Sequence, residues 1–167
     1  MKKISFIFVC SLLLILYFSS VSYSDNDYKL LMKYRDELNK NYKKMRVNNK
    51  RLMQVMKTAK YRGYDIYSKF AALRDDLLWS YDMITLFGIT YGLRNHESKM
   101  ITKRLIYIQE GIQIGLILID KIYDYIKADS LLHIVGEQRA IIRSSLGTLD
   151  KTIKLMKIMP RKESRNK

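Results

Sequence analysis

The sequence predicts an all-α protein, an up-down-up-down four-helix bundle with a long basic first helix that follows an N-terminal signal peptide. Residues that interrupt helices are scarce, because the 167 residues include one proline and seven glycines. Hydrophobic residues make up 48% of the chain and charged residues 28%, a composition typical of a globular domain. After the first 24 residues, apolar residues recur at steps of three and four, which is the period of a helix with one buried side.

Residues 1–24 differ from the rest of the chain and predict an export signal. Two lysines precede an apolar run over 4–18, and small residues that include Ser22 and Ser24 follow it. This order is that of a bacterial secretory signal peptide cleaved before Asp25. The alternative is an uncleaved inner-membrane anchor, since the apolar run and its serine-rich end approach the length of a membrane span.

The first helix is predicted over 26–62. Its apolar side follows a seven-residue repeat, as in helical bundles and coiled coils, and consists of Leu31, Leu38, Met45, Leu52 and Ala59. Arg35 and Asn49 interrupt this side at places where a polar residue can set the register between helices.

The second and third helices are predicted over 64–94 and 98–127, on either side of a break at Asn95 and His96. The apolar side of the second helix consists of Ile66, Phe70, Leu73, Leu77, Ile84, Phe87 and Tyr91. The apolar side of the third consists of Ile101, Leu105, Ile108, Ile112, Gly115, Ile119, Ile122 and Ile126. Both stripes keep helical spacing throughout.

The fourth helix begins at Asp129 and Ser130, which are typical helix N-terminal residues, and continues to Met159. Its apolar side consists of Leu132, Val135, Ile142, Leu146, Leu149, Ile153 and Met156. Arg139 is the one charged residue in that stripe, and the preceding turn brings it toward Asp120.

The predicted division of the chain is a signal peptide at 1–24, a helical bundle domain at 25–159 and a basic disordered tail at 160–167. Pro160 ends the last helix, and chain ends beyond the last packed element fray. The short connections between the long helices make neighbouring helices antiparallel, which predicts the up-down-up-down order.

Positive charge is distributed unevenly over a chain whose formal net charge is +15. Residues 25–62 carry a net charge of +8, residues 63–127 are neutral, and residues 128–167 carry +5. The first and last helices of such a bundle lie side by side, so their charges combine. The residues expected to bind an anionic surface, such as lipid headgroups or lipopolysaccharide, are Lys43, Lys44, Lys50, Arg51 and Lys57. Export argues against nucleic acid as the partner, and solubility alone is the other interpretation of this charge.

Residue types that carry catalysis or bind metals are few. The only cysteine, Cys10, lies in the predicted signal peptide, so the exported chain would lack disulfides, thiolate metal sites and cysteine nucleophiles. The two histidines, His96 and His133, are not accompanied by further metal ligands at the required spacing, and no serine-nucleophile motif is present after residue 24. We therefore expect no enzyme activity, no cofactor and no metal.

The second helix has more apolar residues than one buried side requires. Its second stripe consists of Ala72, Trp79, Met83 and Leu86. Either an extended first helix covers this stripe, or the stripe stays exposed as a docking site. Tryptophan and methionine are enriched in protein interfaces. The third helix is similar, because Glu110 is the only charged residue between Leu105 and Ile119.

Gly111 and Gly115 are four residues apart and predict a close contact between helices. The turn near Asn95 places them opposite Tyr81 and Leu77 of the second helix. An aromatic side chain packed onto the two glycines would account for their spacing.

These features predict an exported, non-enzymatic helical interaction or adaptor subunit of the bacterial envelope. It would form a homo-oligomer, or dock on another envelope protein, through the apolar stripe of the second helix. The alternative is a basic periplasmic or secreted protein that binds anionic envelope surfaces through its first and last helices.

Overall fold

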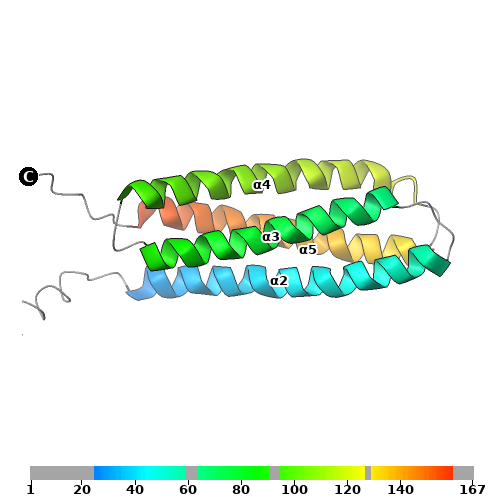
Figure 1. The fold of residues 1–167 in the computed structure, drawn as a ribbon, viewed down its shortest axis with the longest axis horizontal. Helices are drawn as coiled ribbons and strands as arrows, with labels where there is room; N and C mark the ends of the chain where they lie inside the picture. The colour runs from blue at the N-terminus through cyan, green and yellow to red at the C-terminus, as the bar shows by residue number, and fades with distance from the viewer. Residues whose placement is uncertain (1–24, 59–63, 91–94, 127–128, 160–167) are drawn as a thin grey trace, which may run out of the picture.

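The computed structural model describes residues 25–58, 64–90, 95–126 and 129–159. These residues form four α-helices and no strand: α2 (Asp25–Thr58), α3 (Tyr64–Thr90), α4 (Asn95–Tyr123) and α5 (Asp129–Ile158) (Figure 1). The all-helical fold class is thus confirmed. The predicted signal peptide at 1–24 and the tail at 160–167 lie outside the described residues. None of the four helices combines the length and apolarity needed to cross a lipid bilayer.

The four helices pack side by side in a ring. α2 contacts α3 and α5, and α4 contacts the other sides of α3 and α5 (Figure 1). Gly88, near the end of α3, lies against Tyr28 and Met32, near the start of α2, so these two helices run in opposite directions. The side of the molecule formed by α2 and α5 is therefore opposite the side formed by α3 and α4.

The core consists mainly of the apolar stripes that the sequence predicts. α2 and α3 contribute the buried side chains Leu31, Leu38, Met45, Leu52, Ile66, Phe70, Leu73, Leu77, Ile84 and Phe87. α4 and α5, with the residues just after α4, contribute Ile101, Leu105, Ile112, Ile119, Ile126, Val135, Ile142, Leu149, Ile153 and Met156. Burying an aliphatic or phenylalanine side chain contributes about 1.5–3 kcal/mol, so the stripes account for most of the packing between helices. Ala59 and Tyr91, also predicted in these stripes, lie outside the described residues.

The bounds of α4 differ from the predicted ones at both ends. The helix begins at Asn95, so the predicted break there is wrong. Glu97 in the first turn places a negative charge at the positive end of the helix dipole, which favours this earlier start. The helix ends at Tyr123, before the predicted end at residue 127. The backbone N–H of Tyr125 donates to the carbonyl of Ile122 at 3.0 Å, and such a three-residue hydrogen bond tightens and ends a helix.

The buried side of α5 is wider than its predicted apolar stripe. It also includes Leu131, Ile134, Gln138, Ser145, Thr148 and Thr152. Two of its polar members meet polar residues of α2, and in the first of these contacts Nδ2 of Asn41 donates to Oγ of Ser145 at 3.0 Å. Likewise, Nε2 of Gln138 donates to Oδ1 of Asn49 at 2.6 Å. The contact between α2 and α5 is therefore partly polar, and Asn49 lies where a buried polar pair can set the register.

The register between α3 and α4 corrects the predicted glycine contacts. Gly115 lies against Leu73, because an ideal Cβ at position 115 would be 2.6 Å from Cδ2 of that leucine. A Cβ at Gly111 would meet no heavy atom within 4 Å. The predicted contacts with Tyr81 and Leu77 are wrong, since α4 begins earlier than expected and the turn is centred earlier in the chain.

The charged residue within the α5 stripe, Arg139, lies at the contact with α4 as predicted. Its Nε is 2.6 Å from Oδ1 of Asp120, and its guanidinium stacks 3.9 Å from the ring centre of Tyr123. Arg143 adds a second ion pair to Asp120 at 3.1 Å. Burial alone would raise the pKa of Asp120, but the hydrogen bonds and charges of the two arginines lower it below its ordinary value. This cluster is a structural contact between α4 and α5.

Candidate functional site

The predicted apolar stripe of α3 lies on the outside of the bundle. The side chain of Trp79 is 57% exposed, Ala72 and Leu86 are also exposed, and Met83 is partly buried against the core. α2 packs against another side of α3, where Gly88 lies beside Tyr28, and leaves this stripe open. The structure therefore excludes the interpretation in which the first helix covers Trp79.

α4 carries an exposed apolar stripe whose residues the sequence analysis did not single out. It consists of Met100, Tyr107, Ile114 and Leu118. Tyr107 is 58% exposed and Ile114 is 61% exposed, so these large side chains are no more covered than Trp79. The seven-residue spacing of Met100, Tyr107 and Ile114 could have indicated this second stripe. It is difficult to distinguish from the buried stripe of α4, which has the same period and a higher content of isoleucine.

The two stripes adjoin along the line where α3 and α4 meet. A shallow hollow on this line is lined by Asp76, Trp79, Met83, Arg104, Tyr107, Ile108 and Gly111. Residues of both stripes thus share one surface, and Gly111 in the lining of the hollow has open space where a Cβ would be. We call this surface the α3–α4 apolar face and define it by Ala72, Trp79, Met83, Leu86, Met100, Tyr107, Ile114 and Leu118.

Charges of opposite sign border the hollow at its two ends. Asp76 lies on the side toward Leu73, and Arg104 lies at the level of Ile84, about 12 Å away along the helices at 1.5 Å per residue. Burial and the neighbouring charge of Asp75 both raise the pKa of Asp76 above its ordinary value. Asp75 itself forms an ion pair with Arg74 at 2.7 Å. The hollow is therefore acidic at one end and basic at the other.

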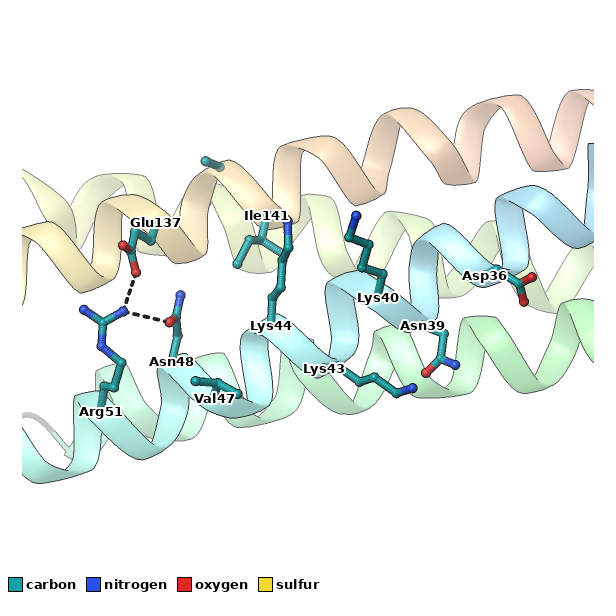
Figure 2. Close-up of a pocket in the computed structure, with 11 residues that line it drawn as sticks. Asp36, Asn39, Lys40, Lys43, Lys44, Val47, Asn48, Arg51, Glu137 and Ile141 are labelled. Atoms are coloured by element: carbon teal, nitrogen blue, oxygen red, sulfur yellow. Dashed lines mark hydrogen bonds and ion pairs between the residues drawn. The ribbon is translucent and has the colours of Figure 1, made fainter.

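A second candidate surface is an open groove of about 940 Å³ on the opposite side of the bundle, between α2 and α5. Lys40, Lys43, Lys44 and Arg51 line the groove together with Asp36 and Glu137 (Figure 2). Three of the residues predicted to bind an anionic surface thus come together here, namely Lys43, Lys44 and Arg51. The other two, Lys50 and Lys57, are exposed on α2 but do not line the groove.

Acidic groups reduce the positive potential at both ends of this groove, Glu137 at one end and Asp36 at the other (Figure 2). Arg51 is bound to Glu137 at 2.8 Å and donates to Oδ1 of Asn48 at 3.1 Å (Figure 2). Lys40 and Lys44 extend from α2 toward α5, where their ammonium groups border the groove (Figure 2). The lysines at the middle of the groove are thus the groups best placed to meet an anion.

Histidine and carboxylate side chains do not gather into a larger cluster within the described ranges. His133 lies 3.6 Å from Glu137, its neighbour one turn further along α5. No group of three or more histidine, cysteine, aspartate or glutamate side chains in these ranges could hold a metal ion. The α3–α4 apolar face and the α2–α5 groove are therefore the two candidate sites. When the chain was compared with protein-family models, curated proteins and solved structures, none of them matched it.

Proposed function

We propose that this chain is an exported, non-enzymatic interaction or adaptor subunit of the bacterial envelope, and that it oligomerises or docks through the α3–α4 apolar face. In this proposal, residues 1–24 are the export signal, and the exported part is an up-down-up-down bundle with a basic first helix. The observation that carries it is the exposure of Trp79 beside the apolar stripe of α4.

Exposed apolar area of this kind is unfavourable in water. Covering it contributes roughly 25 cal/mol per Å² of apolar surface, and large aromatic side chains at the centre of a face contribute most to protein interfaces. Trp79 and Tyr107 lie at the middle of this face, with aliphatic residues beyond them on both helices. A single exposed apolar residue is ordinary, but a continuous stripe over two helices is the pattern of an interaction site.

A photo-reactive benzoylphenylalanine at position 79 should form crosslinks to protein in bacterial cells that express the full chain. The same probe at position 47 is the matched control, because Val47 is 59% exposed but lies on α2, in the groove on the opposite side. Trp79→Asp should remove the association and leave the helical circular dichroism unchanged, since Trp79 is not part of the core. Equal crosslinking at both positions, or none at position 79, would contradict the proposed function.

A second candidate function is binding to anionic envelope surfaces through the α2–α5 groove, which the presence of Lys40, Lys43 and Lys44 in its lining favours. Each lysine near an anionic lipid surface contributes about 1 kcal/mol, and salt screens this attraction.

For this second function, Lys43→Glu combined with Lys44→Glu should weaken binding to phosphatidylglycerol vesicles by about 30-fold or more at low salt. Lys99→Glu combined with Lys103→Glu is the matched control, because it makes the same change of net charge on α4, away from the groove. A sedimentation assay with vesicles measures both. Equal losses in the two double variants would mean that net charge, and not the groove, determines the binding.

A further inference from the structure

We propose that the partner of the α3–α4 apolar face is a second copy of this chain, packed antiparallel about a two-fold axis at the level of Trp79 and Ser80. This inference rests on the proposed function and specifies its partner. Four properties of the face carry it: its net charge, its self-complementary shape, its opposed charges and its area.

Net charge selects this face for self-association. The chain carries +15 in total, so two copies repel each other unless their basic regions stay apart. Residues 63–127, which include α3 and α4, are neutral, and the positive charge resides in the segments of α2 and α5. Since α2 and α5 form the opposite side of the bundle, pairing through α3 and α4 places the basic helices of both copies farthest from each other.

The shape of the face is complementary to itself. The axis we place lies in the interface, perpendicular to the helices, at the level of Ser80 on α3. The contact of Gly115 with Leu73 puts Ile108 at the same level on α4. The two-fold operation then places Trp79 between Trp79 and Met83 of the second copy. It also places Tyr107 between Tyr107 and Gly111 of the second copy, and a Cβ at Gly111 would meet no atom within 4 Å. Each ring therefore has a smaller or more flexible residue of the second copy beside it.

The same axis pairs the two charges at the ends of the hollow. Asp76 is as far before the axis as Arg104 is beyond it, and both border the line between the helices. Asp76 therefore meets Arg104 of the second copy, and the reciprocal pair forms at the other end. Asp82 and Glu110, the other acidic residues near this level, are exposed and do not line the hollow. In the single chain, burial and the charge of Asp75 both raise the pKa of Asp76. A guanidinium from the second copy favours the charged carboxylate and therefore opposes both effects.

The face has the area that a stable dimer needs. The 27 residues of α3 extend about 40 Å, and two adjacent helices are about 20 Å wide. The footprint is therefore on the order of 800 Å² on each copy, which is the size of a standard specific interface.

Reciprocal charge reversal tests this arrangement in the full-length chain, purified as the cells process it. Asp76→Arg alone leaves two basic groups at each end of the interface, and Arg104→Asp alone leaves two acidic groups. Each variant should self-associate at least about tenfold more weakly than the wild type. An equimolar mixture of the two variants should form a heterodimer, and the combined Asp76→Arg, Arg104→Asp chain should dimerise again. Sedimentation equilibrium gives the association constants.

The controls change net charge equally without touching the face. The two control variants are Asp124→Arg and Lys151→Asp. Asp124 lies just after the end of α4, Lys151 lies on α5, and both residues are exposed. Their association should stay within about threefold of the wild-type value, since distant surface charges are screened at physiological salt. Circular dichroism checks that every variant keeps its helical content.

A crosslink from position 79 gives a readout that does not depend on the folding of charge variants. The expected product has twice the mass of the chain and joins position 79 to the α3 peptide around Met83 of a second copy. If the wild type is monomeric and position 79 crosslinks only to a different protein, the partner is not a second copy of this chain, and the proposed function still holds. If the single charge reversals weaken self-association but neither the mixture nor the combined variant restores it, the two-fold arrangement is wrong. Absence of any crosslink from position 79 overturns both.

Discussion

Gly115→Val should lower the free energy of unfolding by about 1–3 kcal/mol, the cost of forcing extra carbon atoms into a packed core. The reason is the contact between α4 and α3. A Cβ at this position would lie 2.6 Å from Cδ2 of Leu73 and 3.2 Å from its Cγ, and Leu73 is buried. The side chain of Leu73 would have to move, and it has little space among its core neighbours. Urea unfolding followed by circular dichroism measures the loss.

Gly147→Val is the matched control for this prediction. Gly147 is exposed in the middle of α5, and a Cβ there would meet no heavy atom within 4 Å. Because glycine is a poor helix former, valine at this position should change stability by only a few tenths of a kcal/mol, in the favourable direction. In a Leu73→Ala background the cost of Gly115→Val should largely disappear. Equal destabilisation at the two glycines would refute the proposed role of the Leu73 contact.

Gln138→Leu should destabilise the bundle by about 1–3 kcal/mol, because it removes the donor to Oδ1 of Asn49 inside the contact between α2 and α5. Both residues are buried, and Nδ2 of Asn49 already has no hydrogen-bond partner in the structure. The amide of Asn49 would then be buried with its carbonyl oxygen unpaired as well.

Replacing both members of this pair gives the opposite expectation. Asn49→Leu combined with Gln138→Leu leaves no unpaired amide at this level, so the double variant should be about as stable as the wild type or more stable. A double-mutant cycle from urea unfolding should give a coupling of about 0.5–3 kcal/mol between the two positions. Additive losses would show that the Asn49–Gln138 hydrogen bond does not matter for stability.

The sequence by itself determined the class of the fold and most of the core. The seven-residue repeat through Leu31, Leu38, Met45 and Leu52 is read directly from spacing, because a helix returns to the same side after two turns. The stripe on α3 that contains Trp79 could also be recognised in this way, since the second set of apolar residues exceeds what one buried side needs. These properties depend on the spacing of residues within one helix, which is a property of the sequence alone.

Only the tertiary structure decided which polar residues are buried and which apolar ones are exposed. Gln138 and Ser145 look like surface residues in the sequence, but they are buried because α2 presents Asn49 and Asn41 to them. Tyr107 has the spacing of a core residue, yet it is exposed beside Trp79.

The register between α3 and α4 likewise depended on where α4 begins, which the sequence analysis placed too late. That start decides whether Gly115 meets Leu73 or Leu77, and whether Gly111 lies beside Trp79. Burial and register depend on residues that are distant along the chain. The spacing within one helix therefore predicts which residues share a side, but the neighbouring helices decide which side is covered.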